Sequence, residues 1–198
     1  MTYLILALCL VFAFCLGSIP FGLVIAKTFK GIDPRKAGSG NIGSTNVARL
    51  CGMPCGLLTL FCDIMKGVLP VLVAVHVLPS EFQQSLVALA AVLGHIKSPF
   101  LGFKGGKGVA TTIGALIPLA FLPLLCAVGC FFVVVFITRY VSLSSMTMSV
   151  ALVVFYAVFG RWELLPLGVV LAVMIIWAHR SNIGRLMRGE ESKFVLKK

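Results

Sequence analysis

The sequence predicts an all-α polytopic membrane protein, a bundle of about seven transmembrane helices with glycine-rich cytoplasmic loops, or of five helices as the alternative. Of the 198 residues, 60% are hydrophobic and only 12% are charged, whereas soluble domains carry about 25% charged residues. This composition excludes a water-soluble globular fold. Neither internal repeats nor low-complexity segments interrupt the chain, so we expect residues 1–198 to form a single integral membrane domain.

Three basic segments predict how the helices are oriented. Residues 27–50, 97–107 and 179–198 together account for the whole net charge of +11. Lysine and arginine beside membrane spans mark the cytoplasmic side, so the three segments should share that side. The same charge gathered in one stripe would have suggested nucleic acid, but spread over loops it sets orientation, and no nucleic-acid partner is expected.

The apolar runs between these segments supply the first three spans. Residues 3–26 are too long for the core of a signal peptide and are not followed by a cleavage site, so we expect a retained span with its N-terminus outside. Residues 50–80 then return to the outer side, and residues 82–96 descend to the second basic segment.

The number of spans in the second half depends on one long run. As a single helix, residues 108–138 would rise about 46 Å, which is too long for an upright span. Pro118 and Pro123 are candidate breakpoints. A crossing out and back gives seven spans and places Ser142 on the side of the glycine loops. Five spans also satisfy the charge rule, but residues 140–178 would then cross once despite the arginine and glutamate within them.

The first loop has the composition of a phosphate-binding loop. Its glycines let amide N–H groups converge on an anion, Ser39 and Asn41 add donors, and a following helix adds its dipole. A dinucleotide fold is excluded because no strand precedes the loop and Asp63, at the spacing of the acidic partner, lies in an apolar segment. The alternative is a flexible turn between spans. The candidate residues are Gly38, Ser39, Gly40, Asn41, Gly43, Thr45 and Asn46.

The second loop repeats this pattern with more charge. Gly105, Gly106 and Gly108 would let the backbone wrap a tetrahedral anion, while Lys104 and Lys107 supply positive charge. Lys107 is followed by glycine rather than serine or threonine, so the loop is not a Walker A motif and an ATP site is not expected. Basic topology determinants with glycine spacers would explain the lysines but not the glycines between them.

A third cluster lies near the C-terminus. If the last span continues as a helix, His179, Asn182 and Arg185 repeat every three residues and share a face at the membrane surface. We expect Glu190 and Glu191 to pair with the arginines and lysines around them. Together with the two loops, this cluster implies a site for one or two phosphates, and apolar helices behind it could hold a lipid chain.

Other polar and sulfur-containing residues are assigned structural roles. Asp63 and Lys66 lie three residues apart in an apolar segment, where a mutual ion pair is favoured over a catalytic role. The seven cysteines form no recognisable disulfide framework or complete ligand set, so we expect them to be packing residues. No metal ion or organic cofactor is expected.

These segments together resemble the bacterial PlsY family, the membrane glycerol-3-phosphate acyltransferases that use acyl phosphate. The resemblance covers essentially the whole chain in the family's order: GSGNIGSTN with Arg49, DIMKG, GHIKSPFLGFKGGKGVAT, RYVSLSS and HRSNIGRLMRGEE. It implies transfer of a fatty acyl group from acyl phosphate to the 1-hydroxyl of sn-glycerol 3-phosphate. It also implies a multi-pass protein of the bacterial cytoplasmic membrane whose active site faces the cytoplasm. Membrane lipid is then the expected surrounding, and no obligate protein partner is expected.

The resemblance also implies roles for individual residues. The two glycine loops would cradle the acyl phosphate, and His179 is a candidate base with a phosphate oxygen of the donor as its rival. We expect the cations and the loops to meet around one pocket that binds two anionic groups. A small transporter of a phosphorylated solute and a lipid phosphatase are the competing functions. The residues expected to hold glycerol 3-phosphate and carry the reaction are Arg49, Lys104, Ser142, His179 and Asn182.

Overall fold

The structure, a computed structural model, describes residues 1–194, and within this range every regular element is helical. The last four residues of the basic segment 179–198 lie outside the described residues. The chain divides into two compact units, Met1–Leu119 and Ala120–Lys198. The all-α prediction is confirmed, whereas the expected single domain stays a prediction.

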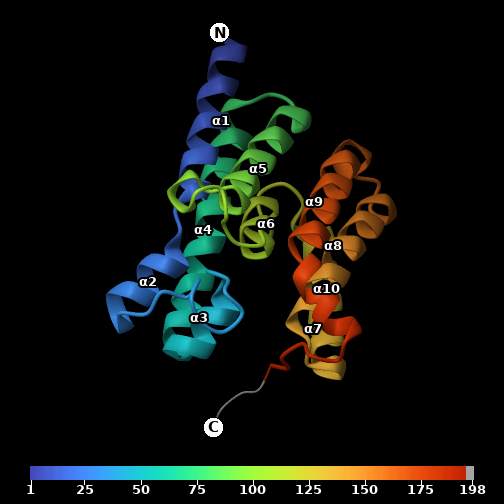
Figure 1. Cartoon of the computed structure of the whole chain (residues 1–198). Coiled ribbons are helices and arrows are strands. Elements are labelled where there is room, and N and C mark those ends of the chain that lie inside the picture. The colour runs from blue at the N-terminus through green and yellow to red at the C-terminus, as the bar shows by residue number, and fades with distance from the viewer. Residues whose placement is uncertain (195–198) are drawn as a thin grey trace. The chain divides into compact units, whose positions relative to one another are not determined.

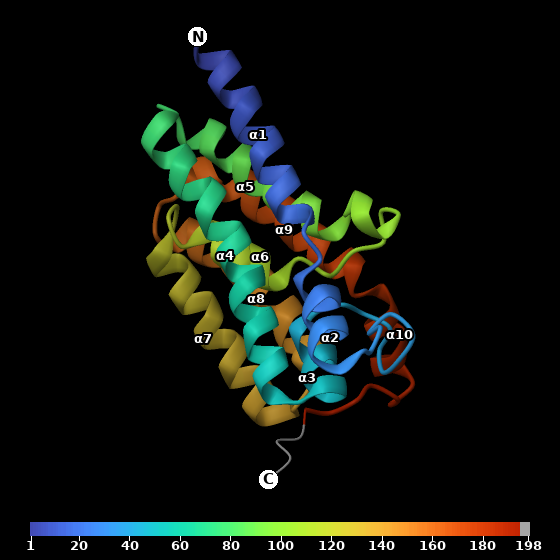
Figure 2. The same ribbon diagram turned by 90° about the vertical axis from the view of Figure 1, so that its left-hand side faces the viewer.

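The first unit contains six α-helices and one 3-10 helix. In this unit α1, α4 and α5 pack side by side, α6 lies against α4, and α3 lies beside the start of α4 (Figures 1 and 2). Its elements are α1 (Thr2–Ser18), α2 (Phe21–Lys30), α3 (Ser44–Cys51), α4 (Met53–Val77), α5 (Glu81–Ile96), η1 (Pro99–Leu101) and α6 (Val109–Leu116).

Glycines bring the helices of this unit into close contact in reciprocal pairs. A Cβ at Gly17 of α1 would overlap the Ala91 carbonyl of α5, and one at Gly94 of α5 would overlap the backbone of α1. Gly67 of α4 and Gly114 of α6 face each other's helices in the same way. Small residues at helix contacts are typical of membrane bundles, where close backbone packing replaces the hydrophobic driving force.

The predicted first span, residues 3–26, is interrupted at Ile19 and Pro20, so α1 and α2 are separate helices. The interruption leaves carbonyl groups without intrahelical donors. Ser98 donates a hydrogen bond of 2.6 Å to the Ser18 carbonyl, and the Lys66 ammonium donates one of 2.8 Å to the Ile19 carbonyl. Two buried side chains therefore stabilise the break.

The ion pair expected within α4 is confirmed. Lys66 Nζ lies 2.8 Å from Asp63 Oδ1, and both side chains are almost completely buried. The sequence did not predict that the same ammonium group would also serve the end of α1.

As far as residue 194, the second unit contains four α-helices and one 3-10 helix. In it α8 packs against both α7 and α9 (Figure 1). The axis bends by 58° between α9 and α10, with His179 at the bend, so the condition that the last span continues as one straight helix is not met at this point. Its elements are α7 (Phe121–Thr138), α8 (Val141–Val158), η2 (Trp162–Leu164), α9 (Leu165–Ala178) and α10 (Arg180–Met187).

Five helical stretches in the described part of the chain are long and apolar enough to cross a membrane, and the bent pair formed by Trp162–Ala178 and Arg180–Met187 would be a sixth. The break at Pro118 is confirmed, whereas Pro123 lies in the first turn of α7, where proline is tolerated. Seven spans would require α6 to cross as well, although its eight residues rise only about 12 Å. The exact count therefore stays a prediction.

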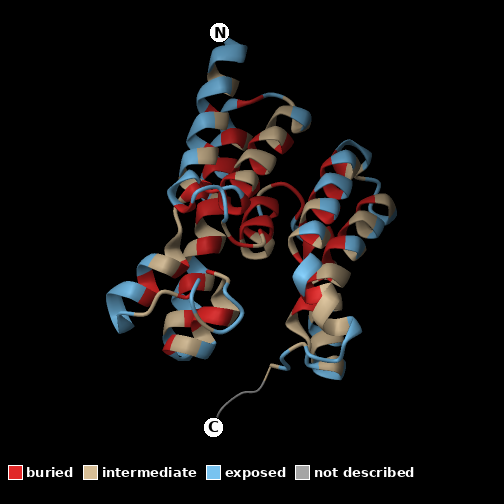
Figure 3. Ribbon diagram, in the orientation of Figure 1, coloured by how far each residue is buried: buried red, intermediate tan, exposed pale blue. Residues whose placement is uncertain are grey.

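Large apolar residues are exposed along the candidate spans. In Figure 3, exposed positions are seen in pale blue along α1 near the N-terminus. Phe136 and Ile137 are 79% and 78% exposed, and Phe132 is half exposed. An outward surface of this kind suits lipid rather than water.

Candidate active site

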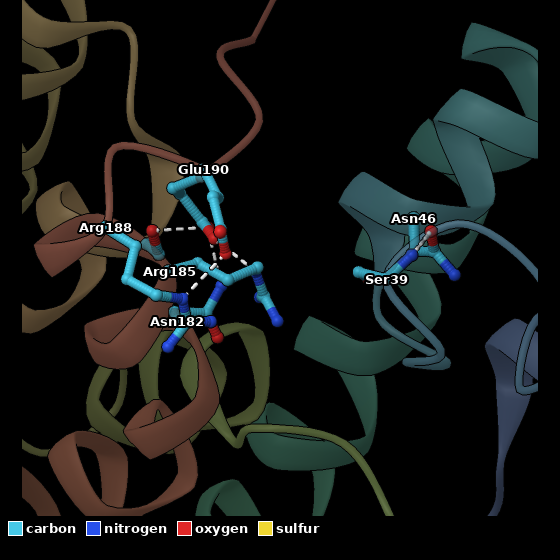
Figure 4. A network of polar contacts seen from close by, with 8 residues as sticks. Ser39, Asn46, Asn182, Arg185, Arg188 and Glu190 are labelled. Atoms are coloured by element: carbon cyan, nitrogen blue, oxygen red, sulfur yellow. Dashed lines mark hydrogen bonds and ion pairs between the residues drawn. The ribbon is translucent and has the colours of Figure 1, made fainter.

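The first glycine loop is organised around Asn46 at the start of α3. Its side chain is 2% exposed, and its Oδ1 accepts a hydrogen bond of 2.9 Å from the Ser39 amide (Figure 4). Its Nδ2 donates to the carbonyls of Pro34, Ala37 and Asn41 at 3.0, 3.2 and 2.8 Å. Both polar atoms of the Asn46 side chain are therefore engaged in hydrogen bonds that shape the loop.

The glycines of this loop serve its turns. Gly38 and Gly40 have φ of +61° and +70°, and a Cβ at Gly38 would overlap the Asn46 side-chain oxygen. The amide of Gly40 donates to the Ala37 carbonyl and that of Gly43 donates to Asn41 Oδ1. These amides are engaged inside the loop, so the expected convergence of amides on an anion is not observed. The candidate anion donors of the loop are side chains, namely those of Ser39, Asn41 and Thr45.

The second glycine loop caps the C-terminal end of α5. The Gly105 amide donates to the Ile96 carbonyl at 3.0 Å, and the Gly106 amide donates to the His95 carbonyl at 3.1 Å. The last carbonyls of a helix have no intrahelical partner, so this pairing satisfies two of them. Here too the amides are engaged within the protein, contrary to the expectation that they wrap an anion.

The lysines of the second loop lie on either side of the paired glycines. Lys104 is exposed and Lys107 is half-buried. Gly108 follows in the left-handed conformation, with φ of +84°, and precedes the first residue of α6. In the same unit, Arg49 lies exposed in the last turn of α3.

In the second unit a carboxylate joins three of the polar side chains singled out in the sequence. Glu191 Oε1 accepts hydrogen bonds from Ser142 Oγ at 2.7 Å and from Asn182 Nδ2 at 2.6 Å. Its Oε2 accepts a hydrogen bond of 2.7 Å from Arg185 Nε. Glu190 pairs with Arg188 at 2.8 Å (Figure 4). The expectation that both glutamates pair with nearby arginines is confirmed.

The environment of Glu191 favours its charged form. Burial would raise the pKa of its carboxyl, but the hydrogen bonds from Asn182, Ser142 and Arg185 and the charge of Arg185 outweigh burial and hold the pKa below its ordinary value. Ser142, Asn182 and Arg185 therefore form a donor set that stabilises an anion. The contacts of Ser142 and Asn182 with Glu191 had no signal in the sequence.

His179 is oriented by the end of α9. The side chain is 2% exposed, and its Nδ1 lies 2.8 Å from the Ile175 carbonyl oxygen. A carbonyl only accepts hydrogen bonds, so Nδ1 carries the proton and Nε2 is the basic nitrogen of the neutral ring. This tautomer is the one that a proton-accepting Nε2 requires.

A family model described as "Glycerol-3-phosphate acyltransferase" matches residues 7–189. A glycerol-3-phosphate acyltransferase of Nitratidesulfovibrio vulgaris is 53% identical over 180 residues, which cover 90% of this chain and 55% of the relative. The chain thus spans about half the length of that relative. A second one, from Desulfovibrio desulfuricans, is 50% identical over 186 residues, covering 94% of this chain and 83% of the relative.

Two solved structures share the fold. A crystal structure of PlsY (YgiH), described as an integral membrane glycerol 3-phosphate acyltransferase in its glycerol 3-phosphate form, has a TM-score of 0.92 and 41% identity, covering 96% of both chains. The lysophosphatidic acid form has a TM-score of 0.89 and 40% identity, covering 96% of this chain and 95% of the other.

Proposed function

Because the chain belongs to the glycerol-3-phosphate acyltransferase family of integral membrane enzymes, we propose that it acylates the 1-hydroxyl of sn-glycerol 3-phosphate with acyl phosphate as the donor. The products are lysophosphatidic acid and inorganic phosphate. The observation that carries the proposal is the similarity over 96% of the chain to a structure of the glycerol 3-phosphate form. The choice of acyl phosphate rests on the resemblance to the PlsY family, and the chemistry of the side chains is compatible with it.

An acyl phosphate is a mixed anhydride whose phosphate leaves without needing a proton. An enzyme that uses it has to orient two anions and stabilise the charge that develops between them. Loop lysines, a serine and an asparagine suffice for this task. None of the three histidines is followed five positions later by aspartate, the His-x4-Asp pattern of the other class of glycerolipid acyltransferases.

Ser142 and Asn182 are proposed to bind the phosphate of glycerol 3-phosphate. Support comes from Glu191, whose carboxylate accepts hydrogen bonds from both side chains and so orients them together beside Arg185. Arg49 and Lys104 are proposed to add positive charge for the same substrate. Both side chains are exposed and can therefore meet a substrate from the aqueous phase.

The glycine loops are proposed to hold the acyl phosphate. Lys107 and the side chains of Ser39, Asn41 and Thr45 would be the donors. Asn46 and the amides of the paired glycines act indirectly, because their hydrogen bonds fix the loop backbones. The full proposed set of loop residues is Gly38, Ser39, Gly40, Asn41, Gly43, Thr45, Asn46, Gly105, Gly106, Lys107 and Gly108.

His179 is proposed to remove the proton from the 1-hydroxyl as its oxygen attacks the acyl carbonyl carbon. The new ester bond forms as the bond between the acyl carbon and the phosphate oxygen breaks, and phosphate leaves with that electron pair. The protonated Nδ1 supports this role, because it leaves Nε2 as the basic nitrogen. A phosphate oxygen of the donor is the competing base.

The enzyme is proposed to lie in the bacterial cytoplasmic membrane with its active site on the cytoplasmic side. The three basic segments support this orientation. Both glycine loops belong to the first two of these segments, and His179 and Asn182 to the third.

The test uses the purified full-length protein in detergent. Acyl phosphate and glycerol 3-phosphate are supplied together and singly, and phosphate and lysophosphatidic acid are measured. Phosphate release that depends on both substrates supports the proposal. Release without glycerol 3-phosphate indicates a lipid phosphatase, and uptake into vesicles without release indicates a transporter. Lysophosphatidic acid formed from acyl coenzyme A but not from acyl phosphate would overturn the choice of donor.

A further inference from the structure

The imidazole of His95 lies directly against Gly106 in the second glycine loop. A Cβ added to Gly106 would overlap His95 Nε2 and come within 3.0 Å of Cδ2. The φ of Gly106 is not positive, so its backbone conformation is open to any residue. Space, and not backbone geometry, therefore demands glycine at this position, and the ring of His95 takes that space.

His95 is itself held from the side of α4. The residue is 4% exposed, and its Nδ1 lies 3.7 Å from Asp63 Oδ1. Asp63 is paired with Lys66, which also donates to the Ile19 carbonyl at the break between α1 and α2. The ring is therefore enclosed between this buried charged pair and the loop.

The two glycines of the loop make three contacts with His95. The Gly106 amide bonds the His95 carbonyl and the Gly106 Cα faces the ring, whereas a Cβ at Gly105 would overlap the His95 carbonyl oxygen. Gly106 thus contacts both the backbone and the ring of His95, whereas the close contact of Gly105 is with the backbone alone. A substitution at residue 95 removes only the contact between Gly106 and the ring.

We propose that His95 is a positioning residue whose ring fixes Gly106 and thereby places Lys104 and Lys107 for substrate binding. This inference rests on the proposed function, in which those lysines hold the substrate phosphates. The two lysines flank the glycine pair, so a displacement of the pair moves both of them. A misplacement of about 1 Å can cost about 100-fold in catalysis.

The decisive experiment is a double-mutant cycle in the purified enzyme. His95→Asn keeps polar atoms near the positions of Nδ1 and Cδ2 but removes Nε2 and Cε1. It is combined with Gly106→Ala and, as the matched control, with Gly105→Ala. The measured quantities are kcat, the KM for glycerol 3-phosphate, and the unfolding temperature in detergent.

We expect Gly106→Ala alone to raise this KM about 100-fold and His95→Asn alone about tenfold, with a smaller effect on kcat. The His95→Asn/Gly106→Ala enzyme should be no worse than His95→Asn alone, because the added methyl group enters the space that the ring has left. The increase in KM caused by Gly105→Ala should persist in the His95→Asn/Gly105→Ala enzyme.

Three results would overturn the inference. The first is that the increases in KM caused by His95→Asn and Gly106→Ala simply add in the double mutant. The second is that His95→Asn restores the KM of Gly105→Ala as much as that of Gly106→Ala. The third is that the His95→Asn enzyme loses its fold or changes only in unfolding temperature. If Gly106→Ala alone does not fold, restored folding of the His95→Asn/Gly106→Ala enzyme supports the inference in the same way as a restored KM. A wild-type enzyme without transfer activity would contradict the proposed function instead, while the cycle in unfolding temperature still measures the contact between His95 and Gly106.

Discussion

The hydroxyl of Ser142 donates a hydrogen bond of 2.7 Å to the carboxylate of Glu191, although 49 residues separate them in the chain. This bond ties the first turn of α8 to the segment that follows α10. The same carboxylate also holds Asn182 and Arg185. One side chain thus sets the arrangement of the donors that we assign to the substrate phosphate.

Replacement of Glu191 should therefore affect both stability and binding. Glu191→Ala removes three hydrogen bonds to a charged group, two of them from the buried side chains of Ser142 and Asn182. We therefore expect a loss of about 3 kcal/mol in the free energy of unfolding. The KM for glycerol 3-phosphate should rise as Ser142 and Asn182 lose their orientation. Glu190→Ala is the matched control, because its pair with Arg188 is exposed and such pairs contribute little. Equal effects of the two substitutions would contradict the assignment.

The stability of the second unit should depend on pH through the same carboxyl group. The pKa of Glu191 in the folded protein is below its ordinary value, so its stabilising effect is complete above the unfolded pKa, about 4.3. The effect is lost as the pH falls through the folded pKa. The difference in unfolding temperature between wild type and Glu191→Gln should be constant from pH 8 to about 6 and shrink below about 4.5. A difference that grows on acidification would exclude this explanation.

Asn46→Ala should disrupt the first glycine loop. The substitution removes four hydrogen bonds from a buried side chain. The Pro34 and Asn41 carbonyls and the Ser39 amide lose Asn46 as their partner, while the Ala37 carbonyl keeps the Gly40 amide, and we expect a cost of about 3 kcal/mol. We expect a lower unfolding temperature and a higher KM for acyl phosphate. Asn41→Ala removes only the bond to Gly43 and should cost less in stability. A larger stability loss in the second variant would show that Asn46 is not the centre of the loop.

His179→Gln separates proton removal from substrate placement. If His179 is the base, kcat should fall about 100-fold or more while the KM values change little. His76→Gln is the matched control. His76 makes the same contact from Nδ1 to the carbonyl four residues earlier, but its side chain is exposed in the last turn of α4. Near-normal turnover of His179→Gln would assign proton removal to the phosphate of the donor.

Lys104→Ala should reduce activity without unfolding the protein. The side chain is exposed, so its removal changes few packing contacts, whereas the lost charge should raise the KM for glycerol 3-phosphate about 10- to 100-fold. Lys30→Ala, another exposed lysine of the basic segments, is the control. Unchanged kinetics at Lys104 would remove it from the proposed site.

The sequence was most informative where the relevant partners are close together in the chain. The Asp63–Lys66 pair and the Arg185–Glu191 and Arg188–Glu190 pairs follow from spacings of two to six residues. The all-α class followed from long apolar runs. These features depend on local geometry, which a single sequence contains.

Other features depend on contacts that spacing does not reveal. The glycine loops were recognised, but their amides bond to Ala37, Asn41, Asn46 and the end of α5, because helix ends and buried side chains compete for the same donors. The interruption at Ile19 was missed because its donors lie 47 and 80 residues away, counted from the carbonyls that they serve. The bend at His179 was missed because α9 and α10 lack a proline between them.

The two donors at the end of α1 also bear on how the protein is made. Ser98 lies 80 residues after Ser18 in the chain, so the Ser18 carbonyl has no side-chain donor when α1 first enters the bilayer. In hydrocarbon such groups require an internal partner. The interruption between α1 and α2 should therefore gain its two side-chain hydrogen bonds only when α4 and the residues after α5 join the bundle.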